Sequence, residues 1–183
     1  MKCIAFCLVV LVTNSAGQDI FSIGIIDTGP GMVYTETDYD AGPAVGNMLN
    51  AHYFPGINFF NGGRYSSARG ELSYVIQRPH YLEGNPKRAE YMSAALYLRG
   101  MIYLHHADGI GKHDLAKTDF EAAIKWNPNN HLAYLELSRV YSDLGFAAPA
   151  FRILDHLLKL KPDQKIEDEA RTELDKLKQI PSR

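Results

Sequence analysis

The chain has 183 residues, with 19 Lys plus Arg against 21 Asp plus Glu, so its formal net charge is -2. This balance argues against a nucleic-acid-binding protein, which needs a strongly cationic face. With 46% hydrophobic and 22% charged residues, the composition is typical of one globular domain.

The first 17 residues have the order of a secretory signal peptide. Lys2 is followed by the apolar run Ile4–Val12 and then by the small-residue stretch Asn14–Gly17. The run is less than half of the roughly 20 residues that a membrane-spanning helix needs. We therefore expect cleavage after Gly17, with Ala16 as the alternative, and a secreted or periplasmic mature chain without an integral membrane span. A buried N-terminal element is the other interpretation of this segment.

Both cysteines, Cys3 and Cys7, lie inside the predicted signal peptide. The mature protein would then have no disulfide, although it would face an oxidising compartment. Its stability would have to come from packing.

Residues 18–44 are predicted to form an acidic N-terminal arm. The stretch from residue 18 to residue 63 contains no Lys or Arg, and residues 27–46 are rich in Gly, Pro, Asp and Thr, which favour turns and extended chain. Two interpretations stay open: a disordered leader, or an arm that docks on its own chain or on a neighbouring copy.

From residue 45 to residue 180 the pattern is helical, and residues 131–162 show the clearest motif. Large, small and aromatic residues recur there at the spacings of a tetratricopeptide repeat. The segment resembles one complete repeat of that family through Tyr134, Leu137, Ser138, Tyr141, Gly145, Ala150, Leu154, Leu157 and Pro162.

The preceding residues 93–128 resemble a second copy, with four extra residues between Gly100 and Ala116. The later spacing is intact, so we interpret the extra residues as a loop insertion between two helices. The positions in register are Leu96, Gly100, Tyr103, Ala116, Phe120, Ala123 and Pro128. Small residues such as Gly100 are expected where two helices approach closely.

Residues 49–82 form a weaker copy, because Pro55 lies where the first helix should carry Leu and should leave that helix kinked or short. Residues 163–178 have one apolar stripe on a charged helix, as expected for a terminal capping helix. The resemblance therefore implies an all-α fold: an α-solenoid of about three helix pairs, a C-terminal cap and an irregular N-terminal arm.

The inserted loop contains several side chains of types that bind metal ions: His105, His106, Asp108, His113 and Asp114. They lack the helical i, i+4 pair that would fix zinc geometry, so a solvated loop is the favoured interpretation. No phosphate-binding loop, nucleophile motif or haem-attachment motif is present, and we expect neither a cofactor nor enzymatic activity.

In tetratricopeptide arrays the first helices of the repeats form an inner face that binds segments of partner proteins. The resemblance thus implies a partner-binding groove lined by Tyr53, Ile57, Phe60, Tyr97, Met101, Leu104, Leu132, Leu135, Arg139 and Ser142. The chain is predicted to be a protein-protein interaction adaptor outside the cytoplasmic membrane. Two alternatives remain: a structural subunit of an envelope or extracellular assembly that self-associates through its arm, and a metal-binding protein using the loop 105–114.

Overall fold

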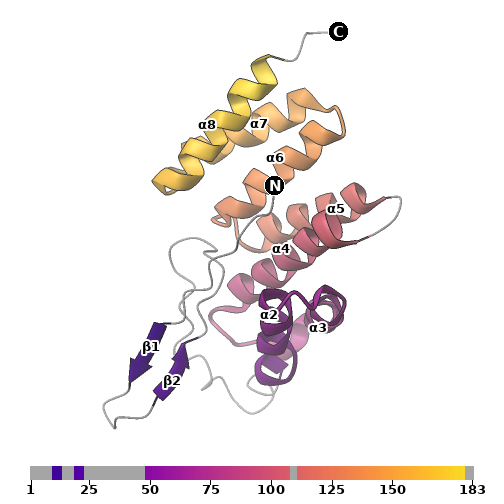
Figure 1. The fold of residues 1–183 in the computed structure, drawn as a ribbon, viewed down its shortest axis with the longest axis vertical. Coiled ribbons are helices and arrows are strands. Elements are labelled where there is room, and N and C mark those ends of the chain that lie inside the picture. The colour runs from indigo at the N-terminus through magenta and orange to yellow at the C-terminus, as the bar shows by residue number, and fades with distance from the viewer. Residues whose placement is uncertain (1–9, 14–18, 23–47, 108–110, 180–183) are drawn as a thin grey trace.

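The computed structural model describes residues 10–13, 19–22, 48–107 and 111–179. Residues 48–179 form an all-α domain, as predicted, in which successive helices stack into an elongated array (Figure 1). Its elements are η2 Leu49–Tyr53, α2 Phe54–Asn61, α3 Tyr65–Gln77, η3 Pro79–Leu82, α4 Arg88–His106, α5 Lys112–Trp126, α6 His131–Asp143, α7 Ala147–Lys159 and α8 Gln164–Lys178.

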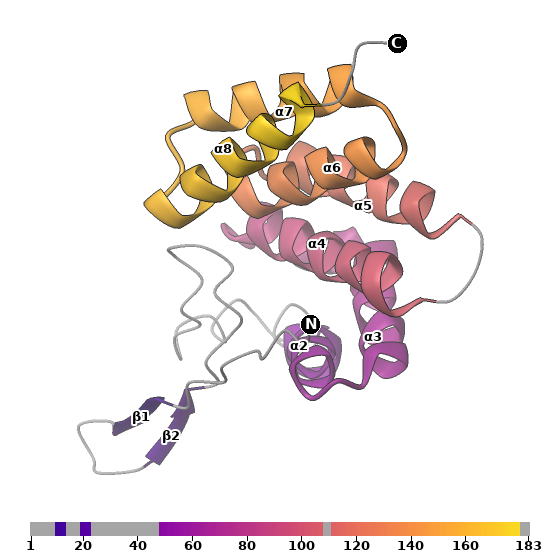
Figure 2. The same cartoon turned by 45° about the horizontal axis from the view of Figure 1, so that its top comes forward.

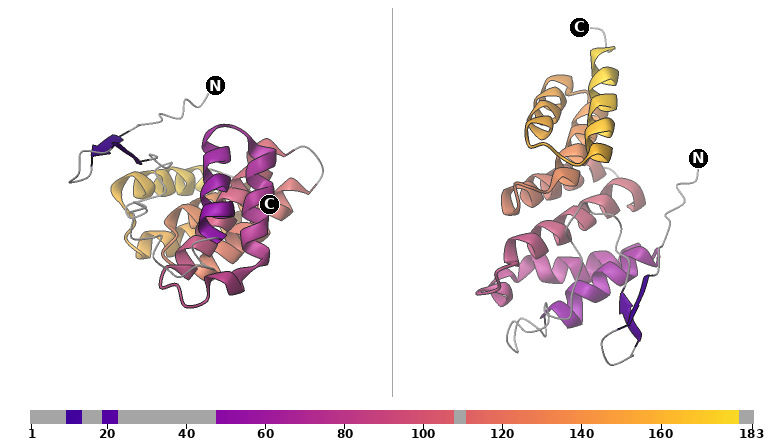
Figure 3. Two further views of the ribbon diagram at one scale, coloured as in Figure 1. Left: turned by 90° about the horizontal axis from the view of Figure 1, so that it is seen from below. Right: turned by 90° about the vertical axis from the view of Figure 1, so that its left-hand side faces the viewer.

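Two short strands precede the helical domain, β1 Val10–Thr13 and β2 Asp19–Ser22, and the sequence did not lead us to expect them. They pair antiparallel, with Val10 opposite Ser22 and Thr13 opposite Asp19. Figure 3 shows this hairpin to one side of the helical stack. The pairing joins the two sides of the predicted cleavage site, so cleavage there would remove β1. The rest of the predicted arm, residues 23–44, lies outside the described residues.

The helices form three consecutive antiparallel pairs and a final single helix. α2 packs on α3, α4 on α5 and α6 on α7, while α8 packs on both α6 and α7 (Figures 1 and 2). This order confirms the predicted solenoid of about three pairs with a C-terminal cap.

The closest approach that we predicted, at Gly100, is present between α4 and α5. A Cβ atom added to Gly100 would lie 2.6 Å from Cε1 of Phe120, which is far inside normal van der Waals contact. Phe120 itself is completely buried. Glycine is therefore required here by space, in agreement with the repeat register.

The turns between paired helices also follow from glycine. Gly63, after α2, and Gly145, between α6 and α7, have φ values of 71° and 80°. Side chains with a Cβ rarely adopt this left-handed region. Gly145 is the turn glycine of the predicted third repeat.

The first helix pair is irregular where Pro55 interrupts it. α2 has only eight residues, Pro55 lies in its first turn, and the preceding residues Leu49–Tyr53 form a π-helical turn. Proline lacks the N–H that an interior α-helical hydrogen bond needs, which explains the change of helix type. The predicted kinked or short helix is confirmed.

The insertion in the second repeat lies in the loop, as predicted. α4 ends at His106 and α5 begins at Lys112, after Gly111 with a φ of 89°. Residues 108–110 lie outside the described residues.

The core consists of two clusters that meet at α6. Ala133, Leu137 and Val140 belong to the larger cluster, which extends from η2 to α6. Tyr134 and Leu135 belong to the second cluster, which continues into α7 and the apolar stripe of α8, formed by Ile166, Ala170, Leu174 and Leu177. α8 thus covers an apolar surface that α6 and α7 would otherwise expose to water.

Candidate functional site

The ten residues predicted to line one groove have two different environments. Five of them are buried in the helical core: Tyr53, Ile57, Tyr97, Leu104 and Leu135. These five expose 0 to 7% of their surface and offer little area to a partner, which corrects the prediction for them. The other five are partly exposed, and a binding role for them stays a prediction: Phe60, Met101, Leu132, Arg139 and Ser142.

Tyr97 is one of the residues that the sequence pattern predicted to be exposed in the groove and that the structure buries. Its side chain is only 6% exposed, and its ring lies 5.9 Å from the ring of Phe120. Burial, with a further contribution from the negative charge of Glu136, raises the pKa of the Tyr97 hydroxyl far above its usual value. This residue supports the packing of α4 and is not a free anchor for a partner.

Arg139 is the centre of an ion-pair network between α6 and α8. Its guanidinium donates to Glu136 at 2.6 Å on its own helix, and to Glu169 at 2.8 Å and Glu173 at 3.2 Å on α8. Lys176 adds a second cation to Glu173, at 3.0 Å. Each of the three guanidinium nitrogens of Arg139 donates to a carboxylate inside the chain, and two of these bonds attach the cap α8 to the third repeat.

Glu136 is the most buried of the three carboxylates in this network and is 7% exposed. Burial raises the pKa of the Glu136 carboxyl, and the charge and hydrogen bond of Arg139 only partly oppose this effect. The nearby carboxylates Glu169 and Glu173 add to the increase. The three carboxylates around one arginine leave the inner side of α6 and α8 locally acidic.

A second network joins the first and second helix pairs. Arg99 on α4 donates two hydrogen bonds to Asp119 on α5, at 2.8 Å and 2.7 Å, and a third to the hydroxyl of Ser73 on α3 at 3.1 Å. Burial alone would lower the pKa of Arg99, but its hydrogen bonds and charge contact with Asp119 raise it. This bidentate pair is nearly buried and holds three helices in register.

A third network, of uncharged groups, joins α4, α5 and α6. The Ser93 hydroxyl donates to the carbonyl of Ala123 at 2.8 Å and accepts from Nδ2 of Asn130 at 2.9 Å. Oδ1 of Asn130 accepts from the backbone N–H of Ala133 at 3.1 Å, which caps α6. One asparagine therefore begins a helix and fixes it to the preceding repeat.

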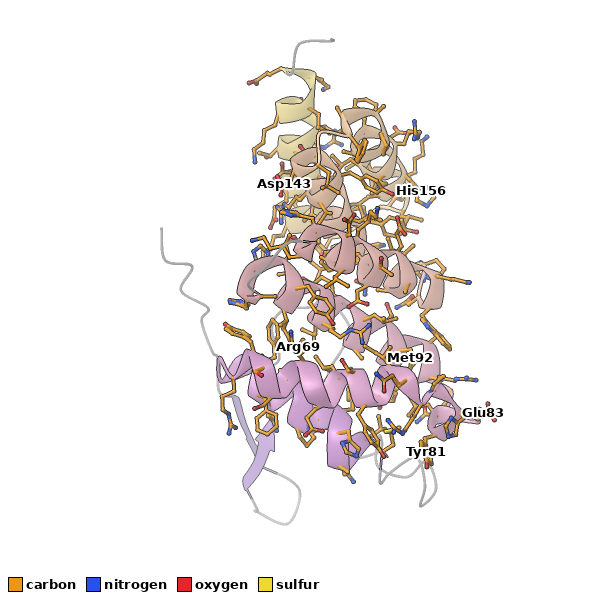
Figure 4. All side chains as sticks on the ribbon, turned by 90° about the vertical axis from the view of Figure 1, so that its right-hand side faces the viewer. Arg69, Tyr81, Glu83, Met92, Asp143 and His156 are labelled. Atoms are coloured by element: carbon orange, nitrogen blue, oxygen red, sulfur yellow. The ribbon has the colours of Figure 1, made fainter. Side chains whose placement is uncertain are left out.

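The candidate metal ligands within the described residues do not form a metal site, although the adjacent rings of His105 and His106 lie 6.2 Å apart. His106 stacks on Tyr65 of α3, with ring centroids 3.5 Å apart. Nε2 of His113 lies 3.9 Å from a carboxylate oxygen of Asp143, at the end of α6. Figure 4 labels Asp143. Asp114 lies 3.5 Å from the ammonium of Lys117. Asp108 lies outside the described residues, and among those described no group of three or more His, Cys, Asp or Glu could hold a metal ion.

No helix in the described part of the chain is both long and apolar enough to cross a membrane.

The sequence analysis did not predict the Arg139 network, although the sequence contains part of the pattern that indicates it. Glu136 and Arg139 have the i, i+3 spacing of a helical ion pair. Glu169 and Glu173 lie 30 and 34 residues from Arg139, and only the docking of α8 brings them to it. In the sequence, these two acidic residues lie one helical turn apart beside the apolar stripe of α8, and this spacing is the only pattern that indicated them.

Comparison with known protein families agrees with the geometry. Residues 93–130, which span most of α4, all of α5 and the cap of α6, match a family model described as a tetratricopeptide repeat. No curated protein matches the chain. Helices α6 and α7 repeat the arrangement of α4 and α5, with Gly145 at their turn. Residues 93–130 therefore form a tetratricopeptide repeat within a continuous stack of helix pairs.

Proposed function

We propose that this protein is a non-catalytic adaptor that acts outside the cytoplasmic membrane and binds a segment of a partner protein on the inner face of its helical stack. The observation that carries the proposal is the tetratricopeptide match over residues 93–130 within a continuous stack of helix pairs. Such repeats stack into extended surfaces and generally serve as protein-binding scaffolds.

The partly exposed residues narrow the contact surface of this proposal. Met101 on α4 and Leu132 on α6 are apolar, and both are only half-buried against the core. Arg139 is already bound by three carboxylates. We therefore assign the partner contacts to Met101 and Leu132, with Phe60 and Ser142 at their flanks.

The test uses one apolar-to-charged change on each of two surfaces. Met101→Glu should weaken capture of the partner from an extract of the source cells by about 30-fold, which corresponds to the roughly 2 kcal/mol that defines an interface anchor. Leu115→Glu is the matched control, because Leu115 is an exposed apolar residue on α5. Circular dichroism of both variants should match the parent. Equal capture by the two variants would place the partner elsewhere.

The proposed location rests on the order of Lys2, the apolar run Ile4–Val12 and the small residues Asn14–Gly17. Exported protein should begin near Gln18, which N-terminal sequencing and intact mass would show. Detection of Cys3 or Cys7 in that material would contradict export with cleavage at this site.

A further inference from the structure

A second concave surface lies on the side of α6 that faces away from the inner groove. It is a cavity of about 310 Å³ lined by Tyr134 and Tyr141 of α6 and by Pro149, Arg152, Ile153 and His156 of α7. We call these six residues the outer groove. Tyr134 and Tyr141 are seven residues apart and lie on one face of α6, roughly opposite Arg139. Figure 4 labels His156 on this groove.

The outer groove has an apolar floor and an open rim. Tyr134 is buried, its ring lies 5.4 Å from that of His156, and Ile153 packs against both core clusters. Next to the groove, Phe146 is 52% exposed and makes an edge contact with Tyr141. The volume is at the lower end of the roughly 300 to 1,000 Å³ of ligand pockets and suits one large side chain.

The preceding repeat is in register with this one but has different residues at the positions that line the outer groove. With Ala116 aligned to Ala150, Ile153 takes the place of Asp119, Arg152 that of Thr118, and His156 that of Ala122. Asp119 is buried against Arg99, so polar contacts within the chain occupy that position. At these positions the third repeat has the apolar Ile153 and the cationic Arg152, whereas the second repeat has Asp119, which pairs with Arg99.

The cation at the rim is not neutralised by its neighbours. Arg152 is exposed and has no ion pair or hydrogen bond within the described part of the chain, whereas Asp155 on the same helix pairs with Lys159 at 2.6 Å. The hydrogen bond to Glu121 and burial raise the pKa of the Tyr141 hydroxyl. The positive charge of Arg152 partly opposes this increase, because its guanidinium lies near the tyrosine. Tyr141 donates to a carboxylate oxygen of Glu121 on α5 at 2.8 Å, so this carboxylate lies on the α5 side of the groove.

We propose that the outer groove binds an extended segment of a partner protein in which an aromatic side chain is next to a carboxylate. The aromatic ring would occupy the floor between Tyr134 and Ile153, and the carboxylate would pair with Arg152. Arginine forms bidentate hydrogen bonds with carboxylates, and aromatic and arginine side chains are enriched among interface anchors. This inference rests on the proposed binding function but uses a different face, so each can fail alone.

The test measures binding of labelled synthetic peptides to the full chain by fluorescence anisotropy. The probe has Phe between two Asp residues in a Gly/Ser context, and two comparison peptides replace either both Asp by Lys or the Phe by Ala. The Phe/Asp peptide should bind saturably, and each comparison peptide should bind at least tenfold more weakly. Absence of saturable binding below about 1 mM, or equal binding of the Lys peptide, would overturn the proposal.

Arg152→Glu should weaken binding of the Phe/Asp peptide at least tenfold. Arg69→Glu is the matched control, because Arg69 is also exposed, lies on α3 (Figure 4) and has no ion pair in the described part of the chain. Met101→Glu on the inner face should also leave peptide binding unchanged, which separates this proposal from the previous one. Equal affinity of the Arg152 and Arg69 variants would refute the assignment.

Deletion of residues 18–44 tests a competing occupant, the chain's own acidic segment. If that segment filled the outer groove, its removal would raise the affinity for the Phe/Asp peptide, and the assignment to a partner protein would be overturned. Unchanged affinity supports a partner. Circular dichroism and thermal melting of each variant confirm that the fold is retained.

Discussion

The contact between Gly100 and Phe120 gives the sharpest test of the packing described above. In Gly100→Ala the added Cβ would lie 2.6 Å, 2.9 Å and 3.1 Å from three carbon atoms of the Phe120 ring. Non-bonded carbon atoms are normally about 3.5 to 4.0 Å apart. Phe120 is completely buried and cannot turn toward solvent, so α4 and α5 would have to separate.

Two effects of opposite sign decide the size of the change. Overfilling a core contact costs about 1 to 3 kcal/mol, whereas replacing a mid-helix glycine with alanine stabilises by about 0.5 to 1 kcal/mol. We expect a net loss of about 1 to 2 kcal/mol in the free energy of unfolding. Urea denaturation monitored by circular dichroism measures this difference.

Gly70→Ala is the matched control, because Gly70 lies inside α3 and an added Cβ would meet nothing within 4 Å. It should stabilise the protein by about 0.5 to 1 kcal/mol. In a background of Phe120→Leu, the cost of Gly100→Ala should shrink, since contacting residues couple by about 0.5 to 3 kcal/mol. The reasoning is refuted if both alanine variants stabilise the protein equally, or if the double variant is strictly additive.

Three further predictions concern other contacts. Ser93→Ala should cost about 1 to 3 kcal/mol in urea denaturation, because Nδ2 of Asn130 loses its acceptor and the carbonyl of Ala123 keeps only the backbone N–H of Asn127 as a donor. Thr118→Ala, on the exposed side of α5, should change stability by less than about 0.5 kcal/mol. Gly145→Ala should cost about 1 to 2 kcal/mol despite open space around it, because its φ of 80° is unfavourable with a Cβ; a stabilised variant would contradict this account. Burial raises the pKa of Glu136 in the folded state, so its protonation stabilises the fold below the unfolded pKa of about 4.5, and this contribution is lost as pH rises through the folded pKa. The melting temperatures of Glu136→Gln and of the parent, measured between pH 4 and pH 7, should therefore converge at low pH. A difference that stays constant with pH would refute the shift.

The sequence predicted the second and third repeats well because their signals are local. The small residue at Gly100, the aromatic residue at Phe120 and the turn glycine at Gly145 each depend on contacts inside one helix pair. Pro55 predicted the short α2 for the same reason, since a missing backbone N–H acts on its own helix. Patterns of this kind can be recognised without knowing how distant parts of the chain meet.

The partner-binding groove was predicted less well, because exposure depends on the whole assembly of helices. Tyr97 and Leu135 occupy positions that face inward in an extended array, but in this short one they are buried. Arg139 was predicted to be an anchor for a partner, but it pairs with Glu136 of its own helix and with two glutamates of α8. A free charged residue and an internally paired one look the same in a sequence.

The docking of α8 determines which surface of the third repeat stays open. Its stripe covers apolar groups of α6 and α7, and its glutamates pair with Arg139, so the cation on the inner side of this repeat is already bound within the chain. On the outer side, no carboxylate of the described residues pairs with Arg152, and the apolar floor around Tyr134 and Ile153 stays accessible from the rim. In a short array whose cap covers the inner side of the last repeat, the outer groove between α6 and α7 becomes the more accessible recognition surface. The two proposed surfaces therefore lie on opposite faces of α6, and a protein that used both would bridge two partners through one helix.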